Sequence, residues 1–370
     1  MAARVGAVPG RSFKMYSNCP AGPGKTPVVM SAMIEDKLYG FTRALMDLDS
    51  TSGREGPAGE FVAAHLRGLG GLEVEVWEVE PGRLNVFAYC GTPRVVLSTH
   101  LDTVPPFIPS REDETAIYGR GACDAKGICA AQVFAAAELL RAGVGDFGLL
   151  FVVGEERNSA GADDADRRRR AHDWGTRFLV NGEPTESRMI RAGKGVLRVD
   201  VRAHGRCAHS AYPELGESAI AKLLQALSRL QALPLPQHPV LGAATLNIGT
   251  LSGGRAPNVI PDQARAELMF RLVEDAATLR AHITTAVAGL AEAEFVLEIP
   301  PIELDVVPGF PTGTVAFGTD IPQLRAWGRP LLFGPGSIHV AHTPEEFIAK
   351  AELRAAVDAY VAIVRHLQTL

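Results

Sequence analysis

Four short apolar runs constrain the fold of this chain more than any other feature. Each run is followed by histidine or carboxylate residues: RVVLSTHLD at 94–102, GLLFVVGEE at 148–156, RFLVNGEPT at 177–185 and RPLLFGPGSIHVAH at 329–342. Short apolar runs bounded by glycine and proline are typical of strands buried in a parallel sheet. Because ligands of open α/β sheets bind outside the carboxyl ends of the strands, the sequence predicts one polar site along one sheet edge.

The polar residues at this edge have the composition of a metal site. The set comprises two histidines and three carboxylate ligands with a spare glutamate, drawn from His100, His342, Asp124, Glu155, Glu156 and Glu183. Such a set suits two divalent metal ions that share a bridging carboxylate and keep positions open for water and substrate. Asp102, two residues beyond His100 on an extended chain, faces the same side and can accept the proton of the other ring nitrogen.

Each candidate ligand also has an ordinary structural alternative. These are a core histidine at His100, an N-cap at Asp124, a solvated pair at Glu155 and Glu156, a turn at Glu183-Pro184 and a helix start at Thr343–Glu346, after His342. Adjacent carboxylates at a buried edge are costly without a cation, which favours the metal interpretation. The joint position of all the candidates at successive strand ends favours it further.

Composition excludes several classes of function. The net charge of −5 gives no electrostatic reason to expect nucleic acid as a partner. No apolar run approaches the roughly 20 residues that span a bilayer, so we expect no membrane association. The five cysteines form no CxxC pair, and reduced thiols in a cytoplasmic enzyme are the expected state.

The order of predicted elements indicates an α/β fold with a mostly parallel sheet. Residues 72–151 alternate between strands and a helix at 125–143, after two predicted helices that begin near Met33 and Glu55. The pattern of predicted elements changes at residues 191–300. They follow the order strand–helix–strand–strand–helix–strand, a split βαβ or ferredoxin-like unit. The last predicted helix, 344–368, returns to the first domain.

This order predicts a domain inserted into another. The catalytic domain is predicted at 31–190 plus 301–370, and the inserted domain at 191–300. Residues 1–30 are rich in glycine and proline and are predicted to be a flexible tail. The AGPGKT segment within them lacks the first glycine of a phosphate-binding loop, because Cys19 stands at that position.

Seven motifs, in order, resemble those of one family of hydrolases. They are HLDTVP, GRGACDAKG, FVVGEE, NGEPTE, GRCAHS, PNVIPD and GPGSIHVAHTPEE, and the similarity runs from about Met33 to the C-terminus. Together they resemble the acetylornithine deacetylase and succinyl-diaminopimelate desuccinylase family of co-catalytic zinc hydrolases, a group that includes aminoacylases, carboxypeptidases and dipeptidases. The resemblance implies that the inserted domain is a lid and forms the interface of a homodimer.

The resemblance also implies a role for each residue of the metal site. His100 and Glu183 would bind one metal ion, Glu156 and His342 the other, and Asp124 would bridge them, with a cis peptide bond after Asp124. Glu155 would be the general base that takes a proton from water and gives it to the departing amine. The metal ions would be zinc or cobalt.

The resemblance implies further contacts with substrate. His209 in GRCAHS would stabilise the oxyanion in the site of the other subunit. Asn258 and Arg271 resemble positions that bind the α-carboxylate of the substrate. Gly334 and Gly336 would bring backbone donors close to the substrate carboxylate or carbonyl.

These roles predict an amidohydrolase that removes the acyl group from a small N-acyl amino acid. N-acetylornithine in arginine biosynthesis is the expected substrate, although His339 stands where an acidic or small polar residue would be expected. The alternatives are a desuccinylase, a dipeptidase or carboxypeptidase, and a hydrolase that releases an amino acid from a carrier protein docked on the arginines at 167–170. A non-catalytic binding protein of the same fold would be expected to lack a ligand or the base, and this chain lacks neither.

Overall fold

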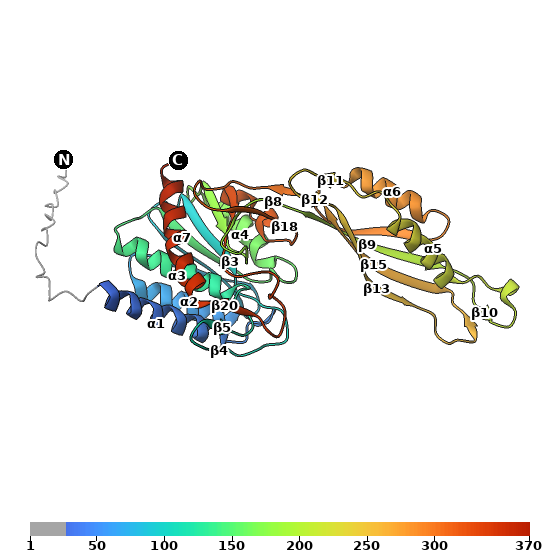
Figure 1. The fold of residues 1–370 in the computed structure, drawn as a ribbon, viewed down its shortest axis with the longest axis horizontal. Coiled ribbons are helices and arrows are strands. Elements are labelled where there is room, and N and C mark those ends of the chain that lie inside the picture. The colour runs from blue at the N-terminus through green and yellow to red at the C-terminus, as the bar shows by residue number, and fades with distance from the viewer. Residues whose placement is uncertain (1–26) are drawn as a thin grey trace, which may run out of the picture.

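A computed structural model describes residues 27–370 and divides them into two lobes (Figure 1). The second lobe, residues 195–299, extends away from the first lobe, which is formed by the rest of the described chain. The predicted fold class is confirmed, because the first lobe is built on a mostly parallel sheet and the second on a split βαβ unit. The predicted tail lies mostly outside the described residues, as does the AGPGKT segment.

The central sheet of the first lobe has six strands. Their order is β1 (Glu73–Glu80), β2 (Arg83–Cys90), β6 (Phe147–Val152), β3 (Val95–His100), β7 (Phe178–Asn181) and β19 (Arg329–Leu332). The last four are mutually parallel, whereas β2 is antiparallel to both β1 and β6. The four apolar runs therefore form the parallel part of the sheet, and their polar ends share one edge.

Helices cover both faces of this sheet because its strands are apolar on both sides. One face packs against the helices α1 (Pro27–Met46), α2 (Gly56–Leu69), α3 (Lys126–Arg141) and α7 (Lys350–Gln368). The other face packs against α4 (Ala160–Ala171) and Trp327, and alternate residues of β3 divide between the two cores. Helix α3 is rich in alanine and is buried on most of its surface, which brings the residues before it close to the strand ends.

The second lobe has its own four-stranded antiparallel sheet and its own core. Strands β9 (Gly195–His204), β13 (Thr245–Gly253), β15 (Gln263–Leu272) and β16 (Glu292–Ile299) lie in the order β13–β15–β9–β16. Helices α5 (Ala219–Gln231) and α6 (Ala277–Val287) pack on one face, where Leu197, Val199 and Val201 of β9 contribute to the core. The side chain of Ser218 caps α5 by accepting a hydrogen bond from the Ala221 N–H.

Short strands complete the two lobes. A three-stranded sheet at the junction contains β8 (Met189–Gly193), β17 (Ile302–Glu303) and β18 (Thr312–Val315), and another contains β4 (Arg111–Glu112), β5 (Ala116–Tyr118) and β20 (Phe347–Ala349). Two small pairs belong to the second lobe: β10 (Ala208–His209) with β14 (Val259–Ile260), and β11 (Gln237–His238) with β12 (Gly242–Ala243). No helix among residues 27–370 is long and apolar enough to cross a membrane.

Two predicted helix starts are wrong. Helix α1 begins at Pro27, within the predicted tail and before the predicted start near Met33. Helix α7 begins at Lys350, and the predicted start at Thr343–Glu346 is instead a turn. Residues Phe347–Ala349, just before α7, form β20 and pair with β5, so pairing with a distant strand overrides the local helix signal.

The arginine run at 167–170 lies on α4 and is neutralised by neighbouring aspartates. Arg168 pairs with Asp164 and Arg170 with Asp166, each one helical turn away, and Arg167 also pairs with Asp164. Arg169 pairs with Asp173. Each arginine of the run therefore has a carboxylate partner.

Candidate active site

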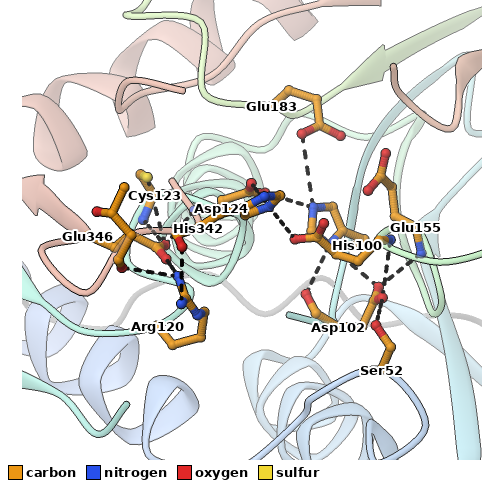
Figure 2. A network of polar contacts seen from close by, with 12 residues as sticks. Ser52, His100, Asp102, Arg120, Cys123, Asp124, Glu155, Glu183, His342 and Glu346 are labelled. Atoms are coloured by element: carbon orange, nitrogen blue, oxygen red, sulfur yellow. Dashed lines mark hydrogen bonds and ion pairs between the residues drawn. The ribbon is translucent and has the colours of Figure 1, made fainter. Parts of the chain in front are cut away.

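The strand ends of the first lobe bring the predicted metal ligands together (Figure 2). His100 is the last residue of β3, Glu155 and Glu156 follow β6, and Glu183 follows β7. His342 lies in the loop after β19, in the left-handed backbone region with φ 65°. Ligands separated by more than 200 residues in the sequence therefore share one edge because their strands are parallel neighbours.

Asp124 lies between the two histidines. Its Oδ1 is 3.0 Å from His100 Nε2, and its Oδ2 is 3.2 Å from His342 Nε2. The N-cap alternative is wrong, because the N-cap of α3 is Ala125 and no side chain caps this helix. One carboxylate oxygen toward each histidine is the arrangement expected of a bridging ligand. The predicted cis peptide bond between Asp124 and Ala125 is present.

Glu156 and Glu183 complete the set on opposite sides of Asp124. Glu156 Oε1 is 3.0 Å from His342 Nε2, and Glu183 Oε2 is 3.9 Å from His100 Nε2. The other oxygen of Glu183 is buried and has no hydrogen-bond partner among the described residues. A buried, unpartnered carboxylate oxygen is costly unless a cation is bound, so the donor set fits divalent metal ions.

The ring of His100 is oriented for metal binding through Nε2. Its Nδ1 is 3.0 Å from the backbone carbonyl oxygen of Asp102 and 3.5 Å from Oδ1 of the same residue. A carbonyl oxygen can only accept, so Nδ1 carries a proton and donates it, and Nε2 would offer its lone pair to a metal ion once it has lost the proton that it shares with Asp124. The nearest partner of the Nδ1 proton is thus the carbonyl of Asp102, whereas the sequence predicted its carboxylate.

The carboxylate of Asp102 instead holds the loop after β6. Its oxygens accept hydrogen bonds from the backbone N–H groups of Gly154, Glu155 and Glu156, and from the hydroxyl of Ser52 at 2.7 Å. These bonds fix the positions of the predicted base and of its neighbouring ligand. Asp102 therefore acts as a positioning residue for both.

Burial and charge shift the pKa values of these groups. Burial opposes ionisation of Asp124, but hydrogen bonds from His100 and His342 outweigh it and hold the pKa of Asp124 below its usual range. Bonds to Asp124 and Glu156 raise the pKa of His342 to about 10. Burial raises the pKa of Glu155 well above its usual range, although the charge of His100 partly offsets this effect.

An ion pair that the sequence did not reveal supports the metal ligands from behind. Glu346 accepts hydrogen bonds from the backbone N–H groups of Cys123 and Asp124, at 3.3 and 3.2 Å, and pairs with Arg120 at 2.6 Å. Arg120 also donates to the backbone carbonyl oxygen of His342. The buried pair therefore connects the loops that carry two of the ligands, Asp124 and His342.

Asp320 is a further buried acid near the site, and no sequence motif points to it. Both of its carboxylate oxygens lack hydrogen-bond partners in the described part of the chain. Burial, with repulsion from Asp102, raises the pKa of Asp320 to about 7, and the charge of His100 partly opposes the shift. Its charge in turn contributes to the raised pKa of Glu155.

Four of the five predicted metal ligands, Asp124, Glu156, Glu183 and His342, line a cavity of about 400 Å³, to which Arg271, Leu297 and Ile299 of the second lobe also contribute. Glu155 lies in its wall, and its carboxylate accepts no hydrogen bond from residues 27–370. Arg271 of β15 reaches the same cavity from the second lobe, and Phe317 and Ile338 form an apolar part of the wall. The structure therefore places Arg271 beside the ligands of its own chain.

His209 and Asn258 lie elsewhere. Strand β10 is at the end of the second lobe farthest from the first lobe (Figure 1). There the ring of the exposed His209 accepts a hydrogen bond from the Ala211 N–H. The backbone carbonyl oxygen of Asn258 accepts one from the Ser210 N–H. These two residues lie together, and neither lines the metal cavity of the same chain.

Gly334 and Gly336 use their backbone donors inside the protein. The Gly334 N–H donates to the Thr185 hydroxyl, and the Gly336 N–H donates to the Glu352 carboxylate. A Cβ atom at Gly334 would lie 2.4 Å from the carbonyl oxygen of Glu183, so glycine is needed there for close packing. A contact with substrate, as predicted, would require these hydrogen bonds to be replaced.

Paired metal ligands, a free carboxylate and an arginine facing one cavity define a class of protein, the metal-dependent hydrolases of amide bonds. The chain belongs to peptidase family M20/M25/M40, whose sequence model matches residues 96–366. The resemblance inferred from the motifs is confirmed at the level of this family.

Known relatives and solved structures agree with this assignment. An M20 domain-containing protein of Schizosaccharomyces pombe is 39% identical over 344 residues, which cover 90% of this chain and 85% of that protein. A probable carboxypeptidase of Aspergillus clavatus is 40% identical over 374 residues, covering 89% and 82%. The fold is similar to that of a Staphylococcus aureus tripeptidase, with a TM-score of 0.77, 21% identity and coverage of 91% and 99%. It is also similar to that of an M20 metallo-carboxypeptidase from Sulfolobus solfataricus, with a TM-score of 0.71, 16% identity and coverage of 90% and 100%.

Proposed function

We propose that this protein hydrolyses the amide bond of a small N-acyl amino acid or short peptide and releases the amino acid with the free carboxylate. One observation carries the proposal: Glu155 and Arg271 face the same cavity, which the predicted metal ligands line, and neither has a polar side-chain partner among the described residues. A free carboxylate suits proton transfer, and a free guanidinium suits a substrate carboxylate.

The ligand set supports two divalent metal ions, with zinc or cobalt as the proposed identities. His100 and Glu183 would hold one ion, Glu156 and His342 the other, and Asp124 both. When bound, such ions supply Lewis-acid chemistry, by making a water more acidic and by polarising a carbonyl.

Glu155 is the proposed general base. It is adjacent to Glu156 but does not contact either histidine, so its carboxylate stays available for proton transfer. It takes the proton from the attacking water and then gives it to the nitrogen of the departing amine. Asp102 holds the Glu155 backbone during both transfers through its hydrogen bond to the N–H.

Arg271 is the proposed anchor for the carboxylate on the released amino acid. Burial lowers the pKa of Arg271, and no carboxylate in the described chain pairs with it. A guanidinium group stays charged nevertheless, and binds a carboxylate through two parallel hydrogen bonds. This contact would favour substrates whose amine side ends in a free carboxylate.

A homodimer is proposed because two of the residues predicted to contact substrate lie on the second lobe, too far from the predicted metal ligands of their own chain to act there. His209 and Asn258 lie at the tip formed by β10 and β14, remote from the metal ligands of their own chain (Figure 1). A partner related by two-fold symmetry could place its tip over this cavity. There His209 would donate a hydrogen bond to the oxyanion, and Asn258 would contact the substrate.

Several substrate classes remain within this proposal. The names of relatives, such as the probable carboxypeptidase of Aspergillus clavatus, favour a peptidase or carboxypeptidase, whereas the motifs favoured N-acetylornithine. A desuccinylase would use the same groups. The carrier-protein alternative loses its docking site, because the arginines at 167–170 are already paired with aspartates.

A cytoplasmic location is also proposed. The four cysteines in the described part of the chain are free thiols, the state that is maintained in a reducing compartment.

A substrate panel tests the proposed function. Purified protein, loaded with Zn²⁺ or Co²⁺, is assayed against N-acetyl amino acids, N-succinyl amino acids and dipeptides. We expect turnover that needs a free carboxylate on the amine side and is abolished by a chelator. Equal turnover of substrates with an amidated carboxylate would contradict the role of Arg271, and turnover unaffected by chelation would contradict the metal mechanism.

A further inference from the structure

A second cavity continues from the metal cavity on the far side of Arg271. Its volume is about 520 Å³, and it shares Arg271, Phe317 and Ile338 with the metal cavity. Its lining also includes Pro184, the residue after the predicted ligand Glu183. A substrate with its carbonyl at the metal ligands and its carboxylate at Arg271 would therefore extend the side chain of its released amino acid into this space.

The wall of the second cavity combines an apolar surface with a guanidinium and an imidazole group at its rim. Ile190, Val315, Phe317 and Ile338 provide the apolar surface, and Arg188 and His339 stand at the exposed rim. The side chain of Arg188 donates only to the backbone carbonyl oxygen of Thr312, at 3.4 Å, and has no carboxylate partner in residues 27–370. An aliphatic stem would fit the apolar surface, and its end would meet Arg188.

The charges in this cavity are unequal. Arg188 and Arg271 are permanently cationic, and the one carboxylate of the lining, Glu186, accepts a hydrogen bond from the Ser337 hydroxyl. A positively charged side chain entering here would meet two guanidinium groups and the single carboxylate of Glu186, whereas an amino acid with a negatively charged side chain would meet a guanidinium partner for each of its two carboxylates. The cavity therefore discriminates by the sign of the charge.

We propose that this cavity selects an acidic side chain, so that the released amino acid carries a second carboxylate on an aliphatic stem. The inference rests on the proposed hydrolysis and specifies its substrate. Arg271 binds the α-carboxylate, Arg188 at the rim binds the side-chain carboxylate, and the apolar wall contacts the stem between them. By the same argument, a basic side chain such as that of ornithine is disfavoured, in contrast to the substrate that the motifs suggested.

Three N-acetyl amino acids that differ only in the side chain test the proposal: N-acetylglutamate, N-acetylleucine and N-acetylornithine. We expect kcat/KM to fall in that order. Because Arg188 is exposed, Arg188→Gln should lower kcat/KM for N-acetylglutamate about fivefold and leave that for N-acetylleucine unchanged. Arg188→Glu should reverse the order of the two charged substrates.

Arg191→Gln is the matched control. Arg191 lies three residues after Arg188, in β8, and donates to the Thr312 hydroxyl, but it does not line the cavity. Its removal should leave the order of substrates unchanged. A preference for N-acetylornithine, no preference among the three, or an equal effect of both arginine variants would overturn the proposal while the proposed hydrolysis stands.

A binding measurement separates failure of this proposal from failure of the proposed function. Calorimetry with free glutamate, leucine and ornithine reports on the cavity without turnover. Tighter binding of glutamate, weakened by Arg188→Gln, would support the acidic cavity even if no tested amide is hydrolysed. Glutamate that binds no more tightly than ornithine would overturn it in the same situation.

Discussion

The two lobes hold their candidate functional residues in opposite ways. In the first lobe the metal ligands are mostly buried, and each is held by neighbours from a different strand end, as Asp124 is by His100 and His342. At the tip of the second lobe the side chain of His209 is exposed, and its one hydrogen bond among residues 27–370 is accepted from the nearby Ala211 N–H. The difference indicates that the first lobe forms its chemistry within one chain, whereas the tip needs another surface to act upon.

The largest expected effect comes from removing the proposed base of the first lobe while keeping the proposed metal ligands. Glu155→Gln should lower kcat by about 10²–10⁴-fold, because only proton transfer is removed. The variant should still bind two metal ions, as measured by elemental analysis. Glu156→Gln is the matched control and should lose metal. The opposite pattern, with metal lost from the Glu155 variant, would reverse the two roles.

The next effect tests whether the tip acts on a partner. His209→Ala should lower kcat by about 10²–10³-fold, as expected for loss of an oxyanion donor. In hybrids of His209→Ala with Glu155→Ala, one site carries both changes and the other carries neither. Free reassortment of an equal mixture should therefore restore roughly a quarter of the wild-type activity, if the interface is two-fold. Hybrids seen by mass spectrometry without recovered activity would place His209 in its own site or in none.

A smaller effect is expected from the ion pair behind the ligands. Glu346→Gln should weaken metal binding by about 10- to 100-fold, because the loop of Asp124 loses an anionic acceptor. Competition with a chelator measures this without any assay of activity. Glu345→Gln, at an exposed neighbouring carboxylate, is the control. Unchanged metal affinity in the Glu346 variant would show that the pair only stabilises the fold.

The smallest effect concerns Asp320. Its folded-state pKa of about 7 lies above that of an unfolded aspartate, so the folded protein binds the proton more tightly. Stability should therefore fall as pH rises from about 4 to 7, and Asp320→Asn should remove this loss. We expect the variant to raise Tm more at pH 8 than near pH 5.5. An equal gain at both values would mean that the charge of Asp320 is compensated.

The sequence predicted most of the first lobe's site. His100, Glu156, Glu183 and His342 follow apolar runs, and such runs report strands through local pattern alone. Parallel strands then align their carboxyl ends, so the ligands were expected to meet without knowledge of any side-chain contact. The split βαβ order of the second lobe was equally visible, since periodicity distinguishes its strands from its helices.

The sequence could not predict which residues support the site. Ser52 and Asp102 are 50 positions apart, and Arg120 and Glu346 are 226 apart, so no local pattern connects them. The prediction of a helix from Thr343 was wrong because of contacts that are distant in the sequence. The Glu346 side chain pairs with Arg120, and the residues after it pair with β5.

The sequence by itself therefore determined the elements, the ligand types and the edge of the sheet where they meet. Only the tertiary structure decided that Arg271 faces the metal ligands of its own chain while Asn258 does not, and that a second cavity lies beyond Arg271. The physical reason is that periodicity and strand ends are properties of short segments. The position of a side chain across a cavity depends instead on how whole lobes pack. The residue pattern of a short segment does not encode that packing.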